Sequence, residues 1–367
     1  MIYDFRKKSK FGYTTGSCAT AGAYSALYYL KFGKKLDYVE IENLNGDKLI
    51  IPIKKIEKLD DNRARAVVVK DAGEDIDITN GVEVITEVVL KKGKRDVVIK
   101  GGEGVGIVTK DGLQVKKGEY AINPKPREMI KTNLLKLLND NEMVEVIISI
   151  PKGKELSKKT LNPKLGIIGG LSILGTTGIV RPMSNEAYMN SLVPQIDVAL
   201  ANGFKRLIFV PGNIGVRFAK QILKAKDEEI IEVSNFWGFM LDKAKEKGVK
   251  EIIILGHAGK IIKLSGGIYN THSKVADCRN EILTAYSSLF IDDKEDLKKI
   301  LYSNTTEEVL KILEKRGVLK DVFNLIAKRV VERVSERWNG IKFGCIVVDM
   351  KGNILGSYLT DLNNKNK

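Results

Sequence analysis

Cysteine and histidine are scarce in this 367-residue sequence. The three cysteines, Cys18, Cys278 and Cys345, lie far apart, and no C-x-x-C spacing occurs. This pattern excludes a disulfide scaffold, and we expect free thiols in a reducing compartment, which favours a cytoplasmic protein. The only two histidines, His257 and His272, have no third ligand at a usable spacing. We therefore expect no metal ion bound by the chain itself.

Long hydrophobic runs are also missing. The longest uncharged run, LGIIGGLSILGTTGIV (residues 165–180), is shorter than the ~20 residues needed to cross a bilayer and is interrupted by glycines. The N-terminus has a basic start but no apolar core after it, so we expect no secretory signal. The sequence therefore predicts no membrane partner.

Several common nucleotide and hydrolase motifs are absent. The segment VVIKGGEGVGIVTKDGL (97–113) lacks the G-x-G-x-x-G pattern, and neither a P-loop nor a G-x-S-x-G motif occurs. Two interpretations of 97–113 stay open: a glycine-rich hairpin, or a ligand loop in which Glu103 reaches a ligand hydroxyl. The acidic segment KDAGEDIDITNG (70–81) lacks the closing Glu of a calcium loop. A solvated acidic turn is favoured there, and a contact to a bound ligand comes second.

The charge balance is strongly basic, with 61 Lys and Arg against 46 Asp and Glu and a net charge of +15. Such a surface attracts polyanions, either nucleic acid or a small molecule with many carboxylates. Aromatic residues make up only 7% of the chain, and the lysines do not interleave with aromatics in a stripe. This argues against nucleic acid, which stays an alternative partner. No oligomeric state is predicted.

The rhythm of expected elements changes along the chain. Strand-like segments cluster before residue 151, after a helix of about 16 residues that Thr14 or Thr15 should cap and Gly33 should end. Strand–turn–helix units repeat in the second half. We expect an α+β domain over residues 1–155 and an α/β domain with a largely parallel sheet over 156–367.

Both histidines fall in one glycine- and serine-rich stretch, GHAGKIIKLSGGIYNTHSKVAD (256–277), directly after the apolar run EIIIL. The run predicts a buried strand that ends at Gly256. His257 should then lie at the carboxyl end of a parallel strand, where ligands bind in α/β sheets. His272 should lie at a second helix start. A single histidine of this kind is more often structural, but both in one segment favour a functional role.

Two hydroxyl-rich segments are further candidates. YTTGSCATAG places Thr14 and Thr15 at a helix start, where backbone N–H groups suit a carboxylate or phosphate. An ordinary helix cap is the alternative. ILGTTGIVRPMS places Thr176 and Thr177 before Arg181, whose guanidinium is suited to grip a carboxylate through two parallel hydrogen bonds.

Taken together and in order, these motifs resemble the signature blocks of the cobalt-precorrin-5B C-1-methyltransferase family, which acts in the anaerobic route to cobalamin. The blocks are GYTTGSCATAGAYSAL, KDAGEDIDITNG, GGEGVGIVTKDGL, GEYAINPKPREMI, NPKLGIIGGLSILGTTGIVRPMS and GHAGKIIKLSGGIYNTHSKVADCRNE. The resemblance covers about residues 11–281 and is highly specific, while the last 80 or so residues contribute little.

The resemblance implies methylation at C-1 of cobalt-precorrin-5B to give cobalt-precorrin-6A, with S-adenosylmethionine as donor. Cobalt would come only with the substrate. Because the chain lacks the usual glycine pattern, we do not expect the common Rossmann-like methyltransferase fold. A transferase of the same fold with another donor stays an alternative.

The same resemblance suggests roles for particular residues. His257 or His272 would accept the proton that the macrocycle loses. The groups expected to bind the acetate and propionate arms of the acceptor are Thr14, Thr15, Thr176, Thr177, Arg181, Lys260 and Lys263. The groups expected to contact the donor are Asp71, Glu103, Gly104 and Gly256.

Overall fold

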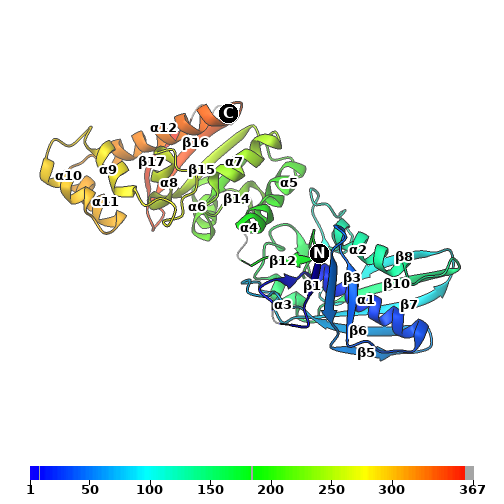
Figure 1. Cartoon of the computed structure of the whole chain (residues 1–367). Helices are drawn as coiled ribbons and strands as arrows, with labels where there is room; N and C mark the ends of the chain where they lie inside the picture. Colours follow the sequence, from blue (N-terminus) through cyan, green and yellow to red (C-terminus); the bar gives the residue numbers. More distant parts are fainter. Residues whose placement is uncertain (8, 183–184, 360–367) are drawn as a thin grey trace. The chain divides into compact units, whose positions relative to one another are not determined.

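The computed structural model describes residues 1–7, 9–182 and 185–359, and the chain divides into two compact units, Met1–Asn185 and Glu186–Lys367 (Figure 1). The sequence prediction placed the division after residue 155. The structure places it later because the segment 167–180 returns to pair with strands of unit 1. These pairings join β11 to β9 and β12 to β2: β2 Gly12–Tyr13, β9 Ile107–Val108, β11 Ile167–Ile168 and β12 Ile179–Val180.

Unit 1 is built on a sheet with the strand order β5-β6-β7-β10-β8, in which only β8 and β10 are parallel. Its strands are β5 Lys55–Lys58, β6 Arg63–Val69, β7 Glu83–Lys92, β8 Asp96–Gly101 and β10 Glu142–Ser149. Burial alternates along β7, as expected where one face of a sheet packs on the core. A smaller sheet has the order β1-β4-β3: β1 Ile2–Asp4, β3 Tyr38–Glu42 and β4 Lys48–Pro52.

Helix α1 (Thr15–Phe32) packs against β6 and β7 in unit 1 (Figure 1). Thr14 caps it and Gly33 ends it in the left-handed conformation, at φ 69°, as the sequence predicts. Its buried face is rich in small residues, which allow close approach: a Cβ at Gly22 would lie 2.8 Å from Oγ1 of Thr86. The other helices of unit 1 are α2 Pro124–Leu135 and α3 Gly153–Ser157.

The glycine-rich segment 97–113 does not form the hairpin that the sequence allowed. After β8 the chain turns through Gly104, and β9 pairs with β11 instead of β8. Gly104 has φ 71°, and a Cβ there would lie 1.8 Å from the carbonyl oxygen of Ile150. Only glycine fits at position 104, where two backbone segments cross closely. This packing requirement explains Gly104 without any bound ligand.

Unit 2 contains a sheet with the order β14-β13-β15-β16-β17, parallel except for β17. Its strands are β13 Arg206–Val210, β14 Ile230–Glu232, β15 Glu251–His257, β16 Lys342–Val348 and β17 Ile354–Leu359. Strands β13 and β15 are buried almost throughout, as expected for parallel strands covered on both faces. Helix α12 covers β16 and β17 (Figure 1).

The helices of unit 2 are α4 Asn185–Leu192, which begins at the division, α5 Pro194–Ala201, α6 Asn213–Leu223, η1 Asp227–Glu229, α7 Trp237–Glu246, α8 Ala258–Ser265, α9 Arg279–Ser287, α10 Lys294–Leu301, α11 Thr306–Lys315 and α12 Leu319–Arg337. The expected fold class is confirmed: an α+β unit followed by an α/β unit. The strand order of unit 2 differs from the 3-2-1-4-5-6 order of the dinucleotide-binding Rossmann fold. None of the helices in the described ranges has the length and apolar character to cross a membrane.

Candidate functional site

The order in which the chain adds strands to the parallel sheet of unit 2 reverses between β13 and β15. From β13 the chain moves to β14 on one side and then crosses back to β15 on the other. Ligands of open α/β sheets bind beyond the carboxyl ends of the strands at such a point. The end of β15 lies against the residue that follows β13 there, since a Cβ at Gly256 would lie 3.1 Å from Cδ of Pro211.

A cavity of about 220 Å³ lies at the carboxyl end of β15 and β16. His257, the last residue of β15, lines it, together with the side chains of α9 and α11 and the turn after β16. These elements contribute Arg279 from α9, Thr306 and Glu307 from α11 and Met350 after β16, and Gly259 at the start of α8 also lines the cavity. His257 therefore lies where the sequence predicts, at the end of a buried parallel strand. Ligand pockets usually measure about 300–1,000 Å³, so this cavity suits part of a ligand.

The His257 imidazole has a lowered pKa. Burial is the main cause, followed by the positive charge of Lys260 and, after an opposing contribution from Glu307, that of Arg279. Asp349, the remaining charged residue of the cavity lining, follows β16. No hydrogen bond or ion pair joins the imidazole to another residue in the described ranges. A neutral imidazole at a cavity wall can accept a proton from a ligand.

The two lysines expected to bind carboxylates hold a loop instead. Lys263 is 2% exposed, and its ammonium donates to the carbonyl oxygens of Thr271 at 3.2 Å and Ala276 at 2.6 Å. Lys260 donates to Oδ1 of Asn235 at 2.5 Å and reaches the carbonyl oxygen of Thr271 at 3.4 Å. A substrate-binding role for Lys263 is therefore not supported, because its charge is enclosed. Both ammonium groups reach the carbonyl oxygen of Thr271 in the segment after α8, and Lys260 also binds Asn235, which precedes the helix.

His272 lies on that segment, residues 270–277, but not at a helix start. The next helix begins only at Arg279, and His272 is exposed, with its Nδ1 accepting the backbone N–H of Lys274 at 3.1 Å. The cavity lining found among the described residues includes His257 and not His272. The expected pairing of the two histidines in one crevice is therefore not supported. Within the described ranges, no cluster of His, Cys, Asp or Glu has the arrangement of a metal site.

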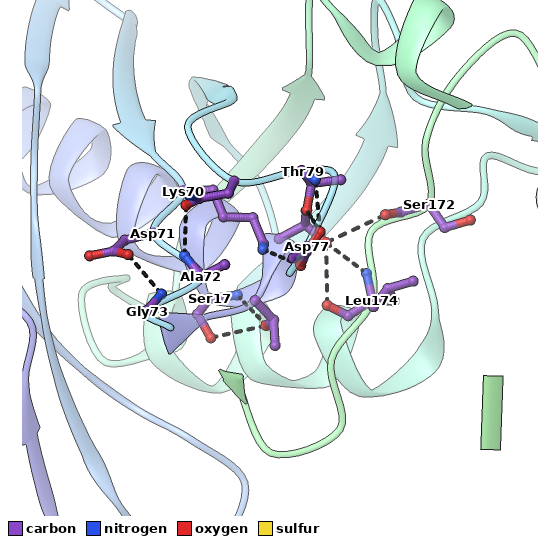
Figure 2. Close-up of polar contacts among 12 residues, drawn as sticks. Ser17, Lys70, Asp71, Ala72, Gly73, Asp77, Thr79, Ser172 and Leu174 are labelled. Atoms are coloured by element: carbon purple, nitrogen blue, oxygen red, sulfur yellow. Dashed lines mark hydrogen bonds and ion pairs between the residues drawn. The ribbon is translucent and has the colours of Figure 1, made fainter. Parts of the chain in front are cut away.

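In unit 1, the motifs YTTGSCATAG, KDAGEDIDITNG and ILGTTGIVRPMS meet around the start of α1 (Figure 2). Tyr13 donates its backbone N–H to the carbonyl oxygen of Asp71 at 2.9 Å, and Thr14 donates to that of Gly178 at 3.1 Å. Gly16 donates to the carbonyl oxygen of Leu174 at 3.1 Å. The segments 11–17, 70–81 and 172–180 thus form one local structure.

This arrangement closes the N-terminus of α1. Thr14 is 7% exposed and Thr15 4%. Oγ1 of Thr14 accepts the N–H of Ser17 at 3.2 Å, and Oγ1 of Thr15 accepts the N–H of Leu174 at 3.0 Å. Their expected contacts to substrate arms are therefore not supported, since both hydroxyls and the N–H groups of Gly16 and Ser17 are used within the protein. The ordinary helix cap describes them better.

Beside this helix start lies an ion pair that sequence reasoning missed. Lys70 is 2% exposed, and its ammonium lies 2.6 Å from Oδ2 of Asp77 (Figure 2). Asp77 also accepts from the backbone and hydroxyl of Thr79, and its pKa is lowered by Lys70 and Thr79 against the effect of burial. The adjacent thiol of Cys18 is fully buried, which raises its pKa to about 12 and keeps it protonated. The acidic segment is therefore anchored through Asp77 and is not simply a solvated turn.

The groups expected to contact the donor are divided between the units. Glu103 is exposed, whereas Gly104 is enclosed by backbone. Asp71 is exposed, and its Oδ1 accepts the N–H of Gly73 at 2.8 Å. Gly256 is buried at the end of β15 in unit 2. The structure brings Glu103 and Asp71 into unit 1 but gives neither Gly104 nor Gly256 an exposed surface for a ligand.

The remaining candidates lie on the surface of unit 1. Thr176 and Arg181 are exposed, and Thr177 is half-buried, with its carbonyl oxygen accepting from Nδ2 of Asn43 at 2.8 Å. Arg181 contributes, after closer partners, to lowering the pKa of Asp47. Thr176 and Arg181 are therefore accessible to a ligand, as their expected role requires.

The cavity residues Arg279, Thr306 and Glu307 were not identified from the sequence. Arg279 follows the histidine segment closely, and the signal for the other two is the helix start in SNTTEEVL, where Thr305 caps α11. Nothing in the sequence indicates that this helix start faces the end of β15. Only the fold places them together.

The structure is thus an α+β unit followed by an α/β unit, with a small cavity at the carboxyl end of two parallel strands, the position where ligands bind in proteins of the α/β class. The CbiD family profile matches residues 2–182, and the profile for the CbiD C-terminal domain matches residues 270–358. The chain belongs to the CbiD family.

Curated relatives support the same assignment. The chain is 85% identical to the cobalt-precorrin-5B C(1)-methyltransferase of Methanocaldococcus jannaschii over 98% of this chain and 99% of the relative. It is 66% identical to the protein of the same name from Methanococcus aeolicus, over 98% of this chain and 100% of the relative. A crystal structure of a cobalamin biosynthesis protein (CbiD) from Archaeoglobus fulgidus is 25% identical over 84% of each chain, with a TM-score of 0.37.

Proposed function

We propose that this chain methylates C-1 of cobalt-precorrin-5B to give cobalt-precorrin-6A, with S-adenosylmethionine as methyl donor. The observation that carries the proposal is the match to cobalt-precorrin-5B C(1)-methyltransferases over nearly the full length of both chains. The reaction belongs to cobalamin biosynthesis. We place it in the cytoplasm, in keeping with the free thiols of Cys18, Cys278 and Cys345.

The charge of the chain suits the acceptor, which carries several acetate and propionate arms. A net charge of +15 attracts such a polyanion over a distance. Arg181 is an exposed guanidinium that can hold one arm through two parallel hydrogen bonds. Thr176 offers an exposed hydroxyl in the same segment. We assign Arg181 and Thr176 to the acceptor and leave the enclosed Thr14, Thr15 and Lys263 out of this role.

His257 is the proposed proton acceptor. When the methyl group has been added to C-1, the macrocycle must lose a proton to restore conjugation. The lowered pKa of His257 keeps its imidazole neutral at neutral pH, so it is ready to take that proton. His272 is a weaker candidate, because it lies on an exposed turn outside the cavity lining.

Calorimetry separates this proposal from a transferase with another donor. S-adenosylhomocysteine and ATP are titrated separately into the purified full-length protein. Saturable binding of S-adenosylhomocysteine with one site per chain, and none of ATP, is the expected result. Binding of ATP alone would overturn the assignment of the donor.

A further inference from the structure

The cavity beside His257 combines opposite charges with an apolar wall. Arg279 is half-buried, and its Nε lies 3.2 Å from Oδ1 of Asp277, while Glu307 lines the same cavity from α11. Leu310 and Met350 add apolar surface. A cation, an anion and methylene-sized apolar surface in one small cavity are complementary to an α-amino acid.

The start of α8 adds donors for a carboxylate. The helix runs over Ala258–Ser265, and His257 at its N-cap position makes no side-chain cap bond. The first N–H groups of a helix have no partner within it and carry partial positive charge. This helix start contrasts with that of α1, where the N–H groups of Ser17 and Gly16 bind Thr14 and Leu174.

Gly259 leaves room between two polar side chains. A Cβ at this position would lie 3.4 Å from Cε1 of His257 and 3.6 Å from Oγ1 of Thr306. The imidazole and the hydroxyl thus face the same space, which lies directly over the start of α8. Thr306 is 6% exposed, and its hydroxyl forms no hydrogen bond with any residue in the described ranges.

The acidic groups of the cavity are not equivalent. Oδ1 of Asp349 accepts the N–H groups of Lys351 and Asn353, both at 2.8 Å, so its charge serves the turn between β16 and β17. Glu307 is exposed and is close enough to His257 to raise its pKa against the effect of burial. Glu307 is thus the acidic group available to an ammonium in the cavity.

From these contacts we infer that the cavity of unit 2 binds the amino-acid end of the methyl donor, with the carboxylate at Arg279 and the start of α8 and the ammonium at Glu307. This inference rests on the proposed function, because it takes the donor from it. A bare acetate or propionate arm fits less well, since Glu307 would repel it. The cavity of about 220 Å³ is below the usual size for a complete ligand, so the adenosyl group lies outside it.

Two substitutions test the site in the full-length protein. Arg279→Ala removes the cation, and Gly259→Ala places a methyl group in the cavity. None of the three nearest contacts of the new Cβ is closer than 3.4 Å, and alanine favours a helix, so the second variant should fold normally. Lys298→Ala is the control, because it removes an exposed cation of unit 2 that does not line the cavity.

Calorimetry with two probes gives the readout. S-adenosylhomocysteine carries the amino-acid group, and methylthioadenosine lacks it. We expect both variants to bind S-adenosylhomocysteine at least about tenfold more weakly. In Arg279→Ala the cause is the loss of a charged hydrogen bond, and in Gly259→Ala it is the loss of space for the carboxylate. Binding of methylthioadenosine should be unchanged, and the control should behave as wild type for both probes.

Other outcomes overturn the inference in distinguishable ways. If the variants bind S-adenosylhomocysteine normally but cobalt-precorrin-5B more weakly, the cavity holds an arm of the acceptor. If they lose both nucleoside probes equally, the cavity does not select the amino-acid group. If the wild-type protein binds neither probe, the proposed donor itself is wrong and the inference falls with it.

Discussion

The ammonium nitrogen of Lys70 lies 2.6 Å from Oδ2 of Asp77, and this pair fixes the acidic segment beside the start of α1. Lys70 is 2% exposed and Asp77 24%. Asp77→Asn leaves a buried ammonium without its anion. We expect a loss of about 3 kcal/mol in the free energy of unfolding, at the low end of the range for buried pairs because Asp77 keeps some solvent. Chemical denaturation measures this loss.

The control for that variant is Glu74→Gln, which changes an exposed carboxylate of the same segment. The double variant Lys70→Met, Asp77→Asn should recover most of the stability, because no buried charge remains. The folded-state pKa of Asp77 is lowered, so its stabilisation is present above the unfolded value of about 3.9 and is lost as the pH falls through the folded value. The gap between wild type and Asp77→Asn should therefore shrink below about pH 4. A constant gap would contradict the ion pair.

Lys263 should matter for the order of residues 270–277 more than for direct substrate binding. Lys263→Met removes the bonds to the carbonyl oxygens of Thr271 and Ala276. We expect faster proteolysis within this segment and a loss of about 1–3 kcal/mol in stability. Lys274→Met, an exposed lysine on the same segment, serves as control. If Lys263→Met shows normal proteolysis but a raised KM for the acceptor, Lys263 binds the substrate directly and the structural role is wrong.

Arg181 should act on the acceptor alone. Arg181→Ala removes one exposed guanidinium, and we expect about tenfold weaker binding of cobalt-precorrin-5B, with unchanged binding of S-adenosylhomocysteine. Lys117→Ala removes an exposed positive charge elsewhere in unit 1 and should have little effect beyond a small dependence on salt. Equal losses for both ligands in Arg181→Ala would rule out a role confined to the acceptor.

The pH profile should report His257. Because its folded-state pKa is lowered, the neutral imidazole persists below the ordinary value of about 6.5, and the acid limb of kcat/KM should lie below that value. Lys260→Met removes a positive charge that lowers the pKa of His257, so this variant should move the acid limb to higher pH. With both substrates saturating, His257→Gln should slow single-turnover methylation by about 10²–10⁴-fold. His272→Ala is the comparison variant, and an equal loss there would shift the role away from His257.

The fold follows from local signals more readily than the site. Alternating burial in β7, the Thr14 cap and the apolar run of β15 are all patterns within a few residues, and each predicts its element. The division between the units cannot be predicted from such local patterns. It depends on the short strands β11 and β12, which pair with segments more than 50 residues earlier, and two-residue strands leave no periodic pattern.

The site shows the same limit. The position of His257 follows from one rule about parallel strands, whereas the roles of Lys263 and Thr14 depend on what packs against them. Both belong to residue types that bind anions when exposed. Here Lys263 is enclosed by the segment that follows its own helix, and Thr14 by the distant segment around Gly178. Lys70 was missed for the same reason, because a lysine at the end of a strand gives no sign of burial.

The most direct test follows a labelled methyl group. The full-length protein is incubated with cobalt-precorrin-5B and S-adenosylmethionine carrying ¹³C in its methyl group, and the product is examined by NMR. The proposed function predicts one new ¹³C-methyl signal, correlated with ring carbon C-1, and one S-adenosylhomocysteine for each methyl transferred. A label at another ring carbon, or a methylated product without release of S-adenosylhomocysteine, would contradict it.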